Sequence, residues 1–130
     1  MIFGGGARAA VRLRNAGCHL WQGQSQLVQV FRINTNTGPF RNEKFRQAFN
    51  YLLDRAAILR VGYAGLGEVT ALPWAPATPA ADRSYDKTYG FDLAKGQALL
   101  KASGLSQSEM NDWKLLVSGG SQDAVAISQV

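Results

Sequence analysis

The sequence predicts an α/β fold in which the local order is strand, helix, long loop, helix, strand and helix. Three observations predict this class. Residues 27–33 and 113–117 have the β-branched and aromatic composition of strands. An apolar stripe with helical spacing begins after Asn42. A second helix, with a start and a stop signal, follows Asp92.

The first strand is predicted at residues 27–33, which alternate partly between apolar and polar side chains. The run ends at residues 34–39, a cluster of turn-forming residues. Residues 1–25, which precede it, are rich in Gly, Arg and Gln. Residues 7–13 could form a short helix, but no sustained apolar stripe supports it, so we predict a weakly ordered segment.

The strongest helix signal follows the turn. Asn42 can cap the helix, and Glu43 in the first turn favours the positive end of the helix dipole. Asp54 could cap a second, slightly re-angled helical segment that ends near Val61. The apolar stripe recurs at three- and four-residue spacing through Phe45, Ala48, Phe49, Leu52, Leu53, Ala56 and Leu59.

Glycines at 62, 65 and 67 end this helix and open a long irregular stretch. They do not form a phosphate-binding loop, because such a loop follows a strand and opens a helix. Residues 72–79 are proline-rich, and no periodicity is evident as far as residue 89. A loop of that length is either functional or packed against something else. Trp74 is therefore the one candidate for a contact with a ligand or a partner.

Asp92 is predicted to cap a helix over residues 93–103, with Gly104 as its left-handed terminator. Gly96 lies on the apolar side of this helix and indicates close backbone packing, because a mid-helix glycine costs about 1 kcal/mol relative to alanine. After the second strand, we expect a turn at residues 118–121 and a third helix from residue 122.

The net charge of +5 is unevenly distributed. Residues 1–60 hold nine basic and two acidic residues, a balance of +7, whereas residues 61–130 have a balance of −2. A basic half can bind nucleic acid or an anionic surface. The basic residues are nevertheless scattered over several elements and match no nucleic-acid motif, so a solvated basic face is the preferred interpretation. A small basic interaction or nucleic-acid-binding protein remains the alternative.

Catalytic and metal chemistry lack candidate residues. Cys18 and His19 are the single cysteine and histidine, too few for a zinc site and poorly placed for nucleophilic catalysis. No convergent carboxylate pair is evident, so we predict no enzyme, no catalytic residue and no cofactor. No window is apolar enough for a membrane span, and residues 1–8 lack the apolar core of a signal peptide.

The order of motifs resembles the family 5 extracellular solute-binding proteins, which serve ABC importers of peptides and nickel chelates. Residues 31–35 (FRINT) resemble the family's strand that ends in Phe-Asn-Thr. Pro39-Phe40 and the following FRQAF resemble its Pro-Phe turn and Arg-Gln-Ala helix. The matching segments continue with LDRAAI at 53–58, the glycines at 65 and 67, the proline-rich loop, residues 89–105, and KLLVSGG from 114.

This resemblance implies a partial second lobe of a two-lobed periplasmic binding protein, type II-like, over residues 26–130. Residues 1–25 show no family pattern. It implies a periplasmic or extracellular protein that captures a small solute such as an oligopeptide and delivers it to membrane permease subunits, without binding nucleic acid. Closure over the solute requires only that the closed state bind it better. None of the family's ligand contacts can be carried onto a position here.

Two positions depart from the family pattern. Asn42 stands near a position where the family usually has an acidic residue, and Gly96 stands where the family prefers alanine. Both changes are compatible with the fold. For the matching residues we predict structural roles, with Arg46 on the solvent side of its helix and bound to a neighbouring carboxylate or carbonyl group.

Overall fold

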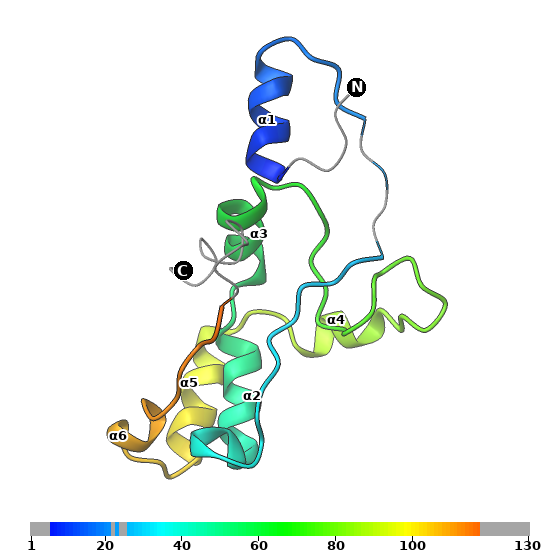
Figure 1. Cartoon of the computed structure of the whole chain (residues 1–130). Helices are drawn as coiled ribbons and strands as arrows, with labels where there is room; N and C mark the ends of the chain where they lie inside the picture. Colours follow the sequence, from blue (N-terminus) through cyan, green and yellow to red (C-terminus); the bar gives the residue numbers. More distant parts are fainter. Residues whose placement is uncertain (1–5, 22, 24–25, 118–130) are drawn as a thin grey trace. The chain divides into compact units, whose positions relative to one another are not determined.

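The computed structural model describes residues 6–21, 23 and 26–117. These residues form two compact units. The first unit combines the described residues up to 23 with Arg55–Val69 and residues 116–117. The second unit combines Gln26–Asp54 with Thr70–Leu115. All regular secondary structure in the described residues is helical, and loops connect the helices, as Figure 1 shows.

The first unit contains helices α1 (Ala7–Asn15) and α3 (Arg55–Tyr63), which are in contact. The guanidinium of Arg8 ties them together, because its Nη2 donates to the carbonyl oxygen of Val61 at 3.0 Å. Helix α3 ends as the glycine pattern predicts. Gly65 takes a φ of +76°, and its N–H donates to the carbonyl of Leu59 at 3.0 Å, which satisfies an orphan carbonyl of the last turn.

The second unit is built on α2 (Glu43–Leu52) and α5 (Leu93–Ala102), which lie side by side. Three short elements accompany them: the 3-10 turn η1 (Gly38–Arg41), α4 (Ser84–Thr88) and α6 (Gln107–Met110). Both predicted caps are confirmed, since the side chain of Asn42 accepts from the N–H of Phe45 and that of Asp92 accepts from the N–H of Lys95. Gly104 takes the predicted left-handed conformation, with a φ of +70°.

Gly96 is buried where α5 crosses α2. A Cβ atom at this position would lie 2.5 Å from both Cγ and Cδ2 of Leu52, and 3.5 Å from the carbonyl oxygen of Ala48. The predicted close packing is confirmed, because Leu52 occupies the space that a larger residue at 96 would need.

An aromatic cluster fills the core of the second unit. Phe40 is 8% exposed and makes edge-to-face contacts with three rings. The centroid distances are 5.2 Å to Phe45, 5.4 Å to Phe49 and 5.7 Å to Trp113. This T-shaped geometry sets the positive edge of one ring against the negative face of the next. The ring contacts therefore stabilise the fold by more than the burial of apolar area alone would.

The turn at η1 depends on Gly38. Its φ is +60°, and a Cβ atom there would lie 2.7 Å from the backbone carbonyl oxygen of Asp112. A larger residue would therefore be strained by its own conformation and would also collide with main chain that follows α6. The approach of these two segments brings Trp113 to the ring of Phe40.

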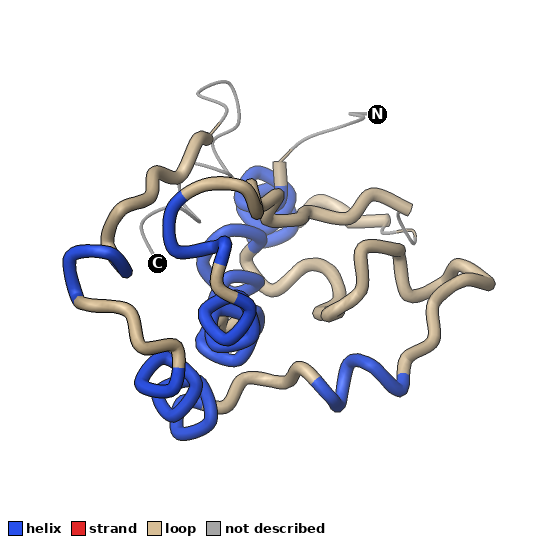
Figure 2. The backbone as a smooth tube through the Cα atoms, turned by 90° about the horizontal axis from the view of Figure 1, so that it is seen from below, coloured by secondary structure: helices blue, strands red, loops and turns tan. Residues whose placement is uncertain are grey.

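The prediction of an α/β fold with a β-α-loop-α-β-α order is wrong for the described residues. Residues 27–33 and 113–117 run without helix or strand, and Figure 2 shows only helices and loops in the described part. A β-strand exists only when its backbone groups pair with a neighbouring strand, and neither run has one there. Their β-branched composition reflects a preference for half-buried packing, which pairing alone turns into a sheet.

Three helices differ from the sequence prediction. Helix α1, nine residues long, lies in the segment predicted to be weakly ordered. Helix α4 interrupts the loop for which no periodicity was found, and α6 was missed although Ser106 and Glu109 form a complete capping box. The turn predicted at residues 118–121 and the helix predicted from residue 122 lie outside the described residues.

Candidate solute-binding groove

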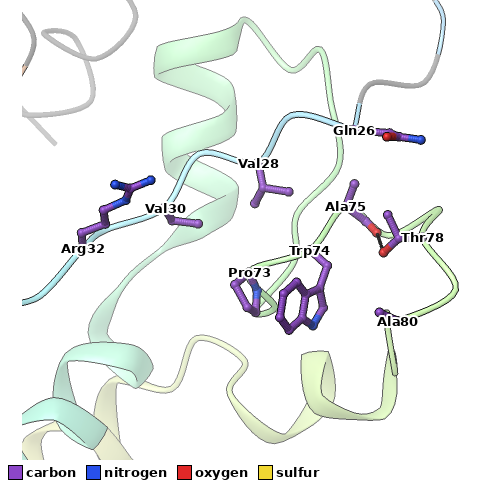
Figure 3. Close-up of a pocket in the computed structure, with 9 residues that line it drawn as sticks. All are labelled: Gln26, Val28, Val30, Arg32, Pro73, Trp74, Ala75, Thr78 and Ala80. Carbon is purple, nitrogen blue, oxygen red and sulfur yellow. Dashed lines mark hydrogen bonds between the residues drawn. The ribbon is translucent and has the colours of Figure 1, made fainter.

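An open groove lies on the second unit between an extended segment, residues 26–32, and the proline-rich loop, residues 73–80 (Figure 3). Its volume is about 580 Å³. Nine residues line it, and both of its walls belong to the same compact unit. The lining residues are Gln26, Val28, Val30, Arg32, Pro73, Trp74, Ala75, Thr78 and Ala80.

The first wall uses alternate residues of an extended chain. Successive side chains of an extended chain point to opposite sides, so residues two apart share one side. Gln26, Val28, Val30 and Arg32 follow this rule and line the groove together. Alternate residues therefore face the groove, but they are both polar and apolar, and the segment forms a groove wall and not the predicted strand.

The second wall is a loop that local hydrogen bonds hold in shape. Ala75 is 2% exposed, and its carbonyl oxygen accepts from the N–H of Thr78 at 2.9 Å and from the Thr78 hydroxyl at 2.8 Å. Pro73 fixes its own φ next to Trp74. Trp74 as a residue remains 49% exposed and lines the groove. The candidate residue selected from the sequence therefore lines this groove.

Asp86 anchors the same loop at its N-terminal end. Its Oδ1 accepts from the N–H of Ala71 at 2.6 Å and from the hydroxyl of Thr70 at 2.9 Å, and its Oδ2 lies 3.1 Å from Nε of Arg83. Partial burial acts to raise the pKa of the Asp86 carboxyl, but the hydrogen bonds from Ala71, Thr70 and Arg83 outweigh it and lower the pKa. No motif in the sequence marks Asp86, because its partners at positions 70 and 71 are defined only by the fold.

Two further side chains behave as structural residues. Arg46 donates from Nη1 to the carbonyl oxygens of Phe40 at 2.8 Å and Arg41 at 3.0 Å, which confirms the predicted bond to neighbouring carbonyl groups. Lys95 lies over the ring of Tyr51, with Nζ 4.2 Å from the centroid. A hydrogen bond involving Tyr51 is the main reason why the pKa of Lys95 is raised.

The residues that line the groove offer groups that can bind a solute, but they include no set of catalytic side chains. Its lining combines apolar side chains and an indole with one amide, one hydroxyl and one guanidinium. Cys18 is exposed and belongs to the other unit. Within residues 6–21, 23 and 26–117, no three potential metal ligands come together. This chemistry suits a small solute with both apolar and polar groups.

The sequence model of the "Bacterial extracellular solute-binding proteins, family 5 Middle" matches residues 8–130. The chain belongs to this family. The resemblance inferred from the motifs is thereby confirmed. The family 5 match also includes residues 8–25, where no motif was apparent.

Curated proteins that are similar in sequence include the glutathione-binding protein GsiB of Escherichia coli O1:K1, of Shigella boydii serotype 4 and of Salmonella typhi. Each is 32% identical to the chain over 97 residues, which is 75% of the chain. The chain spans only 19% of the length of these relatives. No solved structure matches the chain significantly. Among the described helices of this family 5 chain, none is long and apolar enough to cross a membrane.

Proposed function

We propose that this family 5 chain contributes one part of the solute-binding subunit of an ABC importer. The subunit captures a small peptide-type solute on the outer side of the cytoplasmic membrane, in the periplasm where one exists, and delivers it to the permease. The match of the family sequence model to residues 8–130 carries this proposal. The chain then catalyses no reaction, because capture requires only that the solute stabilise the binding conformation.

Glutathione is the first solute to test. The curated relatives carry the name glutathione-binding protein, and glutathione is a tripeptide whose size suits a cavity of about 580 Å³. The proposed contact is the exposed indole of Trp74, which can pack against the peptide backbone or the cysteine side chain of the solute. Val28 and Val30 on the opposite wall would exclude water from the same contact.

Isothermal titration of the full chain with glutathione and with a small set of dipeptides tests this proposal. We expect saturable binding that Trp74→Ala weakens at least about fivefold, because an aromatic anchor in a pocket typically contributes more than about 1 kcal/mol. Trp21→Ala is the matched control. Its side chain is 88% exposed and does not line the groove, so the same chemical change should leave the affinity unaltered.

Two results would contradict the proposal in different ways. Absence of saturable binding to every peptide would remove peptide-type capture from this chain. Equal affinities in the Trp74→Ala and wild-type chains would leave capture intact and remove the groove as its place. The nucleic-acid alternative gains no support from the structure, since Arg8 and Arg46 donate to backbone carbonyls. Binding of nucleic acid that weakens steeply with salt would revive it.

A further inference from the structure

Basic residues gather on the first unit almost without acidic partners. Its described residues include five arginines, three of them on α1 and two on α3, whereas Glu68 is the one acidic residue among them. Arg12, Arg14 and Arg60 are exposed, and their guanidinium groups make no ion pair or hydrogen bond with another described residue. The first unit therefore carries positive charge that its own described side chains do not neutralise.

Helix α1 has an apolar stripe that its own unit leaves partly uncovered. Ala9, Ala10 and Leu13 are three and four residues apart and lie on one side of the helix, with Arg12 on one flank and Arg14 on the other. No residue of α1 is buried, and Leu13 is 39% exposed. A helix this short is marginal in water, so a partner that covers the stripe would stabilise it.

The chain that follows α1 adds an exposed indole. Gly17 takes a φ of +86°, and the N–H of Cys18 donates to the carbonyl oxygen of Leu13 at 3.0 Å, so the helix ends in a left-handed turn. Trp21 follows this turn and is 88% exposed. Indole rings and arginine side chains are both suited to a membrane–water interface, because each combines an apolar body with a polar or charged end.

We propose that the first unit docks on a membrane surface of anionic phospholipid through α1 and Trp21. The apolar stripe faces the boundary between headgroups and acyl chains, and the arginines on its flanks reach the lipid phosphates. Charge complementarity selects this partner, because each basic side chain near an anionic surface adds to the attraction. Nucleic acid would meet the same charge but would leave the stripe uncovered. This surface belongs to a different unit from the groove, so the proposal does not depend on solute binding.

Cosedimentation of the full chain with vesicles tests the proposal. Vesicles of phosphatidylcholine alone are compared with vesicles of phosphatidylcholine and phosphatidylglycerol, at low and at physiological ionic strength. We expect binding only where phosphatidylglycerol is present, and we expect the affinity to fall as salt screens the exposed arginines. Equal binding to both kinds of vesicle, or binding to neither, would overturn the proposal.

Charge variants test whether α1 is the docking element. The double variant Arg12→Gln, Arg14→Gln should bind anionic vesicles about 25-fold more weakly, since each basic side chain near the surface contributes about fivefold. Arg12→Lys with Arg14→Lys should keep most of the affinity, because the attraction requires the charge and not the guanidinium fork. The control is Arg41→Gln with Lys44→Gln, which removes the same charge from exposed residues of the other unit. An equal loss in the control would contradict docking through α1.

Trp21 provides a readout that leaves the charge unchanged. Its fluorescence should shift to the blue on anionic vesicles, and Trp21→Phe should remove this shift whereas Trp74→Phe keeps it. A shift that survives in Trp21→Phe would contradict the contact. Binding of a double-stranded oligonucleotide without binding of vesicles would assign the basic surface to nucleic acid instead. Self-association in sedimentation velocity that Leu13→Lys abolishes, again without vesicle binding, would assign the stripe to a second copy of the chain.

Discussion

The side-chain amide of Asn42 joins the first turn of α2 to the residue that follows α5. Its Oδ1 accepts from the N–H of Phe45 at 3.2 Å, and its Nδ2 donates to the carbonyl oxygen of Ser103 at 2.9 Å. A carboxylate could make the first bond but not the second. The departure from an acidic residue near this position therefore has a structural use, because only the amide serves both helices.

Asn42→Asp should lower the free energy of unfolding by about 1–2 kcal/mol at neutral pH, since the carboxylate keeps the cap but faces the Ser103 carbonyl without a donor. Urea unfolding of the full chain measures the change. Asn34→Asp is the control, because Asn34 uses only its Oδ1, which accepts from the N–H of Asn36 at 2.9 Å. Equal stability of the two variants would show that the bond to Ser103 contributes nothing.

Gly96→Ala should destabilise the chain even though alanine is the better helix former. The helix gains about 1 kcal/mol from the substitution, but overpacking against Leu52 costs about 1–3 kcal/mol. In the presence of Leu52→Ala, the same change at 96 should become favourable. Thermal unfolding of the wild type, the two single variants and the double variant gives the coupling free energy between positions 52 and 96. We expect it to exceed about 0.5 kcal/mol.

Gly90 provides a control position for the substitution at Gly96. A Cβ atom at Gly90 would approach nothing closer than 3.9 Å, so Gly90→Ala should be close to neutral. If Gly96→Ala proves as mild as Gly90→Ala in the wild-type background, Leu52 moves aside freely and the packing is looser than its distances indicate.

Because of Asp86, the free energy of unfolding should fall as the pH is lowered in the acid range. Its folded-state pKa is lowered, so its contribution is fully present above the unfolded value of about 3.8 and is lost as the pH falls through the folded pKa. Asp86→Asn should therefore cost about 1 kcal/mol at pH 7 and less at pH 2.5, where part of the contribution is lost. Asp112→Asn at an exposed position is the control. A cost for Asp86→Asn that is the same at both pH values would contradict the electrostatic account.

Phe40→Ala should be the most damaging of these changes, at about 3–5 kcal/mol, because it removes the ring that contacts three others. Phe91→Ala removes the same atoms from a side chain that is 54% exposed and should cost far less. Urea unfolding compares the two variants, and near-ultraviolet circular dichroism should report the loss of ring packing for Phe40→Ala alone. Similar losses of unfolding free energy and of near-ultraviolet signal in both variants would contradict a central role for the aromatic cluster in stability.

Local signals in the sequence predicted the starts of α2 and α5 and the turn that follows α5. The cap at Asn42, the cap at Asp92 and the left-handed glycine at 104 are properties of a few neighbouring residues, and the structure confirms each of them. Gly96 was also correctly interpreted, because a glycine in a helix needs a packing reason. The capping box at Ser106 was just as local, and it could have revealed α6.

Features that depend on distant residues could not be predicted in the same way. Residues 27–33 have strand composition, but whether they pair depends on which other segments lie beside them. Residues of this run instead form one wall of the groove, where apolar Val28 and charged Arg32 lie on the same side. Trp74 was selected because exposed aromatic residues on loops often face partners. Asp86 was not selected, since its partners Thr70 and Ala71 are brought to it only by folding.

The contact between Phe40 and Trp113 also has a consequence for how the protein is made. The two rings are separated by 73 positions, from residue 40 to residue 113, and the ribosome delivers them in that order. During the synthesis of the intervening chain, Phe40 and Phe49 lack the partner that completes their packing. The growing chain thus exposes incompletely packed aromatic side chains until Trp113 emerges, and such surface is more prone to aggregation than that of the finished fold.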